Sequence, residues 1–416
     1  MLQRLSTLQD IQKMYRWFEE MRATQPVWLD PDSGCWHAFR YQDVLRVTTD
    51  YKSFSSKRPR AVARFTTRST LANSLISMDP PQHRHYRNLV GPSFTTRALA
   101  PLAERIRAIV QELLDRVRPT GHMDVVADLT YPLPTTVIAE MLGVPTTDRP
   151  TFKRWADALF SRQLSDAEIF HPEELARLEQ TESFQLANRA MEEMYEYFER
   201  ILEERRQHPQ NDLIGELLTA EVEGERLGSE QVISFCILLL LAGHITTTLL
   251  LGQAILCLDE HPEAMQQLRE QPECIPSAIE EVLRYASPVW RLIRVTTEEV
   301  NVGGLTIPAN AVVFAWLASA NRDSTQFPDP TRFDITRAPN HHLAFGHGIH
   351  FCVGAPLARL ETSIALPMIL EQLPQLRRDR SEPLELLNGS SLFGVKKLPV
   401  TFAASLPLQA SSGRAQ

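Results

Sequence analysis

The sequence predicts a mainly helical, single-domain protein with small β-sheets. Three observations support this class: apolar residues recur with helical spacing along most of the chain, strand-like segments are short, and no Gly/Ser-rich linker divides the 416 residues. With 43% hydrophobic residues the chain can bury a large core. We therefore expect one domain over residues 1–416, with about 405–416 as a flexible tail.

Apolar periodicity places the expected helices near 9–24, 83–94, 98–118, 134–142, 172–207, 229–260, 276–286 and 355–370. Strands are expected at Val27–Leu29, Trp36–Arg40, Arg291–Thr297, Val300–Val302, Val312–Trp316 and Pro399–Phe402. The first two strands should form a hairpin. The helices account for far more of the chain than the strands, which is why we predict a mainly α fold.

Composition excludes several function classes. The net charge of −8 offers no basic face for nucleic acid. The polar N-terminus lacks the apolar core of a secretory signal, and the most apolar run, 232–258, is broken by GHITTT, so we expect a buried helix and no membrane span. The five cysteines form no CxxC pair, which excludes a disulfide framework or zinc site. We expect a cytoplasmic monomer.

A glycine-rich segment, FGHGIHFCVG (345–354), precedes the last long predicted helix. Glycines such as Gly346, Gly348 and Gly354 let a backbone turn tightly and approach a flat ligand. Helix N-termini favour anions, so Cys352 should have a lowered pKa and bind a metal as thiolate. The alternative interpretation is a buried structural cysteine in a glycine-rich loop.

This segment resembles the complete haem-binding signature of the cytochrome P450 family, and the resemblance extends from about residue 10 to 404. It implies the cytochrome P450 fold, haem b as cofactor, and Cys352 as the metal ligand. Phe345, Gly346 and Gly354 should contact the cofactor. A thiolate ligand favours cleavage of the O–O bond in this family. The implied activity is a haem-thiolate monooxygenase that inserts one oxygen atom from O2 into an apolar organic substrate.

Two further segments supply partners for the haem propionates, which need cationic or hydrogen-bonding groups. DPPQHRHYR (79–87) and RVTT (294–297) are similar to family motifs. The resemblance implies four propionate ligands: His83, Arg87, Arg294 and His350. His83 and Arg87 are four residues apart and share a helix face. We expect Arg84 and His85 on the surface.

A structural network is implied by two other motifs. EVLR (281–284) and PTRF (330–333) resemble the Glu-x-x-Arg pair and the later arginine element of the family. The resemblance implies that Glu281, Arg284 and Arg332 form a buried network that fixes the Cys352 loop. Such a network must be hydrogen-bonded throughout to offset its desolvation. The alternative for Glu281 and Arg284 is a solvated pair on a helix surface.

The long apolar helix contains AGHITT (242–247), which resembles the family's oxygen-binding pattern. Ala242 should contact haem, and Thr246 should lie beside dioxygen and help deliver protons. Thr246 could instead bond only to its own helix backbone. The family has Asp or Glu where this chain has Ile245, which cannot relay a proton. His244 should point to another helix face. The alternative function is therefore a peroxide-driven or non-oxygenating haem-thiolate enzyme.

The resemblance also implies a substrate pocket walled by Leu239, Ala242, Trp290, Leu292, Ile293 and Phe393, together with the 60–77 loop. Ordinary core packing is the alternative for each of these residues. A mobile lid is expected around Phe160–Phe184. Because no reductase motif follows the haem region, electrons should come from a separate ferredoxin or flavodoxin. Hydroxylation or epoxidation, with a role in secondary metabolism, is expected.

Two other classes stay open at this point. A haem-thiolate binding or sensor protein would share Cys352 and the propionate ligands but would not need Thr246. A helical scaffold without any cofactor would need none of these residues. Product formation separates the first class from an enzyme, and the colour of the purified protein separates the second.

Overall fold

A computed structural model describes residues 7–57, 74–160, 172–222, 224–388 and 391–405. Its helices are α1 (Leu8–Thr24), α2 (Tyr41–Thr49), α4 (Gln82–Val90), α5 (Thr96–Leu99), α6 (Leu102–Val117), α7 (Pro132–Met141), α8 (Arg149–Phe160), α10 (Pro172–Glu179), α11 (Glu182–Gln207), α12 (Leu213–Thr219), α13 (Ser229–Glu260), α14 (Pro262–Glu270), α15 (Ile275–Tyr285), α16 (Leu317–Ala320) and α17 (Ala355–Gln372). A π-helical turn, η3 (Val126–Thr130), precedes α7. The predicted mainly helical fold is confirmed.

The strands are short and belong to small sheets. They are β1 (Val27–Leu29), β2 (Trp36–Ala38), β3 (Phe54–Ser55), β4 (His122–Asp124), β5 (Glu221–Val222), β6 (Glu225–Arg226), β7 (Leu292–Thr296), β8 (Val300–Val302), β9 (Leu305–Ile307), β10 (Val312–Ala315), β11 (Arg377–Arg378), β12 (Glu385–Asn388), β13 (Phe393–Lys397) and β14 (Pro399–Thr401). The largest sheet has the order β1-β2-β10-β7-β3, in which β2 and β10 are parallel. It contains the expected β1–β2 hairpin.

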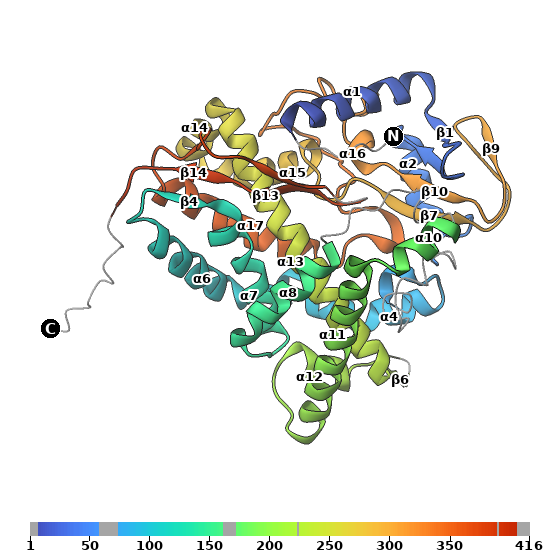
Figure 1. Cartoon of the computed structure of the whole chain (residues 1–416), viewed down its shortest axis with the longest axis horizontal. Coiled ribbons are helices and arrows are strands. Elements are labelled where there is room, and N and C mark those ends of the chain that lie inside the picture. The colour runs from blue at the N-terminus through green and yellow to red at the C-terminus, as the bar shows by residue number, and fades with distance from the viewer. Residues whose placement is uncertain (1–6, 58–73, 161–171, 223, 389–390, 406–416) are drawn as a thin grey trace.

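The helix α13 is the centre of the core and runs through the middle of the molecule (Figure 1). By length and composition it could cross a membrane, yet 78% of its most apolar stretch is buried inside the protein. It packs against α7, α11 and α17. Gly243 permits the close approach to α7, because a Cβ there would lie 2.8 Å from Ile138 Cδ1. The bounds Ser229–Glu260 are those expected from sequence.

Several predicted boundaries were wrong for local reasons. The expected helix 172–207 is two helices, because the Thr181 side chain accepts a hydrogen bond from the Phe184 backbone N–H and starts α11 anew. The expected helix 83–94 ends at Val90, before Gly91 and Pro92. The helices α2, α8 and α14 were missed. Pro262 ends α13 as expected, and it also occupies the first turn of α14.

Candidate active site

A cavity, here called the cysteine cavity, lies between α13 and the loop that carries Cys352. The residues of this cavity on α13 are Phe235, Leu238, Leu239, Ala242, Gly243, Thr246, Thr247 and Leu250. Their spacing of three and four residues places them on one helix face. The opposite side is formed by the 344–354 loop and the first turn of α17. This arrangement is a slot between a helix and a loop, with a thiol at its edge.

The Cys352 loop is held by its own backbone. The Cys352 N–H donates to the Phe345 carbonyl at 2.9 Å. Gly346 and Gly348 have φ values of 70° and 72°, in the left-handed region that favours glycine. A Cβ on Gly348 would lie 3.0 Å from Thr49 Cα. Gly354 has an ordinary φ of −83°, so the sequence argument from tight turning does not apply to it.

Cys352 is exposed to the cavity, whereas Cys35, Cys236 and Cys257 are buried. Deep placement of its sulfur raises the thiol pKa, and the N–H groups of Gly354 and Ala355 only partly oppose this. The sequence had predicted a lowered pKa from the helix N-terminus alone. Desolvation outweighs that effect, and a bound metal ion would favour the thiolate.

Four basic side chains gather at one end of the cavity. The rings of His83 and His350 lie 4.2 Å apart, centroid to centroid. Neither His83 Nε2 nor His350 Nε2, both buried, has a hydrogen-bond partner among the residues that the structure describes. Burial lowers the pKa of His83 to about 4, with Arg87 and Arg294 adding to the effect. Burial also lowers the pKa of Arg294 to about 10. Asp79 opposes both shifts, but it forms no ion pair with these side chains within the described residues.

Haem fits this set of donors. Within the described residues, neither Arg87 nor Arg294 forms an ion pair with a carboxylate, and Arg294 donates only to the Ile293 carbonyl, at 2.8 Å. Buried cations and orphaned imidazole nitrogens require anionic partners, and two propionates would provide them. The described part of the chain also contains no group of three His, Cys, Asp or Glu that could hold a metal. A metal at Cys352 must therefore bring most of its own ligands.

The family model described as Cytochrome P450 matches residues 35–275 and 273–402. The chain belongs to the cytochrome P450 family. It is 41% identical to cyclomarin C epoxidase CymV of Salinispora arenicola over 390 residues, which cover 94% of this chain and 96% of the relative. It is 40% identical to erythromycin C-12 hydroxylase of Saccharopolyspora erythraea over 397 residues, covering 95% and 96%.

A solved structure agrees with these relatives. The crystal structure of CYP109E1 from Bacillus megaterium in complex with testosterone matches with a TM-score of 0.82 and 39% identity, covering 93% of this chain and 99% of that one. As a cytochrome P450, this protein is an oxidoreductase, a monooxygenase that carries haem b. The scaffold class is thereby excluded.

Thr246 lies on the cavity wall of this P450. Its hydroxyl donates to the Ala242 carbonyl at 2.6 Å, and α13 continues through the AGHITT segment without a break. Ile245 is half-buried and is not among the cavity residues. His244 points away from the cavity: its ring packs edge-on against Tyr131 at 4.6 Å. No acid therefore stands beside Thr246 on α13.

Three of the expected pocket residues lie on the cavity wall and three do not. Leu239, Ala242 and Leu292 line the cavity. Alternation along β7 turns Ile293 away from the face that carries Leu292. Trp290 packs on Phe393, with ring centroids 4.3 Å apart, in a separate aromatic cluster. Trp290, Ile293 and Phe393 therefore do not line the cysteine cavity, and their contact with substrate stays a prediction.

Sequence reasoning missed other cavity residues. These are Phe235, Leu238, Val289 and Leu317, whereas Leu75 and Ile76, which also line the cavity, belong to the expected 60–77 loop. Phe235 and Leu238 could have been found by extending the helix face of Leu239 and Ala242 back by one turn. Of the expected 60–77 loop, residues 60–73 lie outside the described residues, as do 161–171 of the expected lid and 406–416 of the expected tail.

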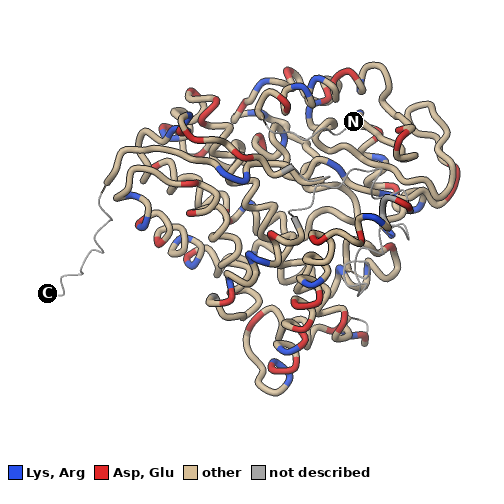
Figure 2. The backbone as a smooth tube through the Cα atoms, in the orientation of Figure 1, with Lys and Arg blue, Asp and Glu red and all other residues tan. Residues whose placement is uncertain are grey.

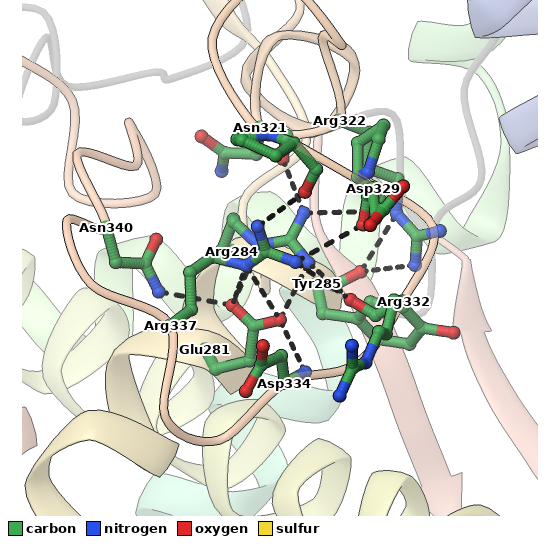
Figure 3. Close-up of polar contacts among 12 residues, drawn as sticks. Glu281, Arg284, Tyr285, Asn321, Arg322, Asp329, Arg332, Asp334, Arg337 and Asn340 are labelled. Atoms are coloured by element: carbon green, nitrogen blue, oxygen red, sulfur yellow. Dashed lines mark hydrogen bonds and ion pairs between the residues drawn. The ribbon is translucent and has the colours of Figure 1, made fainter.

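The predicted network around Glu281 exists, but its third arginine is different (Figure 3). Arg284 Nη2 and Nε donate to the Glu281 carboxylate at 2.7 and 2.8 Å, and both side chains are fully buried. Arg337 Nε completes the network at 3.2 Å from Glu281 Oε2. Arg332 offers only its carbonyl, which accepts from Arg284 Nη2 at 3.0 Å. The prediction for the Arg332 side chain was wrong because the chain turns between 332 and 337.

Proposed function

We propose that this P450 hydroxylates or epoxidises an apolar organic molecule, with electrons from a separate ferredoxin or flavodoxin. The observation that carries the proposal is the wall of the cysteine cavity above the thiol. Apart from the Thr246 and Thr247 hydroxyls, the described residues of α13 on this wall are apolar. Such a wall orients a substrate by shape and excludes water. We further propose a cytoplasmic monomer with a role in secondary metabolism.

The named relatives support this reaction class. One is an epoxidase, one is a hydroxylase, and the crystal structure of CYP109E1 holds testosterone. All three names concern organic molecules. They do not favour the peroxide-driven alternative that Ile245 raised, nor a sensor without turnover.

Different residues of the cavity would have different roles. The Cys352 thiolate would hold the iron, and His83, Arg87, Arg294 and His350 would hold the propionates. Bound haem supplies activation of O2 at the iron. Ala242 leaves room beside the cofactor on α13. The Thr246 hydroxyl, now donating to the Ala242 carbonyl, can rotate to hold a water or pass a proton at its oxygen.

Removal of Cys352 tests the assignment directly. The Cys352→Ala protein should lose the thiolate-type absorption of the reduced, carbon-monoxide-treated haem, and should form no product from apolar substrates. Cys274→Ala is the matched control, since Cys274 is half-buried and does not line the cavity. A parental spectrum in the Cys352 variant would overturn the proposal.

Ile245 allows a second test, of proton delivery. We propose that Thr246 and water deliver protons without a neighbouring acid, which makes oxygen activation slower or leakier. Ile245→Asp should then increase the product formed per reductant consumed. Tight coupling in the parent that aspartate does not improve would reject this idea. Turnover with peroxide alone, without external reductant, would favour the alternative enzyme.

A further inference from the structure

A second cavity, here called the α1 cavity, lies between α1, the C-terminal part of α13 and the end of α15. Its volume is about 340 Å³, within the range of roughly 300–1,000 Å³ found for ligand pockets. It shares no described lining residue with the cysteine cavity. The two cavities therefore occupy different stretches of α13.

Gln253 on α13 carries an amide that lacks a partner. The residue is only 4% exposed, lines the α1 cavity, and forms no hydrogen bond with the described residues. Its amide atoms are not sealed from solvent, so they open onto the cavity. Because the amide belongs to the cavity wall, a ligand in the cavity can bond to it.

Arg322 contributes a cation to the wall of the same cavity. It is 8% exposed, and its guanidinium lies 3.7 Å from the Tyr15 ring centroid and 3.9 Å from that of Tyr285. Nε and Nη2 both donate to the Tyr285 carbonyl, at 3.3 and 2.7 Å, which caps the C-terminus of α15 (Figure 3). Within the described residues, Arg322 has no carboxylate partner. The guanidinium instead contacts two tyrosine rings and one backbone carbonyl.

The remaining wall combines charged residues of both signs with apolar residues. Arg16 and Arg22 of α1 add two more cations, against Glu19 and Glu260. Arg22 donates to Ser319 and forms no ion pair within the described residues. The apolar part of the wall consists of Leu8, Ile11, Leu256, Ala286 and Phe393. Figure 2 shows that acidic and basic residues both occur along α1.

We propose that the α1 cavity is a second binding site, for a small organic carboxylate with an apolar or aromatic body. The carboxylate faces Arg322 and the Gln253 amide, and the body packs on Leu256 and Phe393. A carboxylate accepts from both donors, which an apolar ligand cannot do. The site is separate from oxygenation, so its ligand is not the substrate of the cysteine cavity.

The test uses the holoenzyme with 2-naphthoate as probe and isothermal titration calorimetry as readout. The cysteine cavity is first saturated with 1-phenylimidazole, which ligates haem iron. One equivalent of 2-naphthoate should still bind, and neutral 2-naphthalenemethanol should bind much more weakly. Gln253→Leu should weaken naphthoate binding about tenfold or more, because a hydrogen bond to a charged group is lost.

Controls keep the result interpretable. Gln266→Leu, an exposed glutamine on α14, should leave naphthoate binding unchanged. Arg322→Lys keeps the positive charge but removes the stacking of the guanidinium on the two tyrosine rings. Thermal unfolding shows whether each variant is folded. The proposal is overturned if naphthoate does not bind, if phenylimidazole displaces it, if the neutral alcohol binds equally, or if Gln253→Leu binds like the parent. None of these outcomes bears on oxygenation.

Discussion

Two polar clusters of this P450 differ in how far their charges are satisfied by the protein. The Glu281 cluster is buried and closed: both carboxylate oxygens accept hydrogen bonds, and Arg284 donates to backbone carbonyls as well. The cluster of His83, Arg87, Arg294 and His350 is open: His83 and Arg294 are buried, Arg87 and His350 are half-buried, and two buried imidazole nitrogens lack partners within the described residues. A closed cluster needs nothing more, whereas an open one needs a ligand of opposite charge.

The partners of the charged residues distinguish a cluster that holds the fold from a cluster that binds a ligand, independently of the sequence motifs. Glu281 and Arg284 link α15 to the 321–340 segment that precedes the Cys352 loop. Their role is to hold that segment in place. The open cluster lines or adjoins the cavity, where haem can complete it. The same residue types therefore serve different purposes, and the difference lies in their partners.

The largest effect is expected from opening the closed cluster. Arg284→Leu leaves the Glu281 carboxylate buried without its main partner, and should reduce the free energy of unfolding by about 3–5 kcal/mol. Denaturant unfolding of the purified protein measures this. The double variant Glu281→Leu/Arg284→Leu should lose less than the two single losses added together. A single variant as stable as the parent would show that the cluster contributes little.

A smaller effect should distinguish the two candidate third arginines. Arg337→Ala removes hydrogen bonds to Glu281 and to the Pro328 carbonyl, at 3.2 and 2.7 Å, and should cost about 1.5–3 kcal/mol. Arg332→Ala keeps the carbonyl that the cluster uses and should change stability by about 0.5 kcal/mol or less. The same unfolding assay compares them. Equal losses would contradict the assignment of Arg337.

The open cluster should respond with opposite signs in the two forms of the protein. Arg294→Leu removes a buried cation without an anionic partner, so the haem-free protein should become more stable by about 1 kcal/mol. The haem-bound variant should release haem about tenfold faster, because a propionate partner is lost. Arg84→Leu, on the exposed side of α4, is the control. Destabilisation of both forms would mean that Arg294 is structural.

The smallest effect concerns pH. In the haem-free protein the pKa of His83 is about 4, lowered by burial from 6.5. The unfolded chain therefore takes up this proton first, and stability should fall as pH drops from about 6.5 to 4. His83→Phe should flatten part of this dependence. Bound propionates favour the charged imidazole and should flatten it too. Unfolding at several pH values, with and without haem, decides whether His83 faces an anion.

The sequence by itself determined the features that are encoded locally. The Cys352 loop is ten consecutive residues whose glycines set the backbone, and α13 has the bounds that its apolar run indicates. His83 and Arg87 share a helix face by spacing alone. Each of these depends on contacts within one element, which a pattern in the chain can record.

Only the tertiary structure decided what depends on distant segments. Arg337 replaced Arg332 because the path of the chain across Glu281 determines which guanidinium reaches it. Trp290 packs against Tyr15 and Phe18 of α1, and Phe393 packs on Trp290, so both residues belong to an aromatic cluster and do not line the cysteine cavity. Burial reversed the expected shift of the Cys352 pKa. Desolvation and long-range packing depend on segments that lie hundreds of residues apart in the chain. A local sequence pattern therefore cannot predict them.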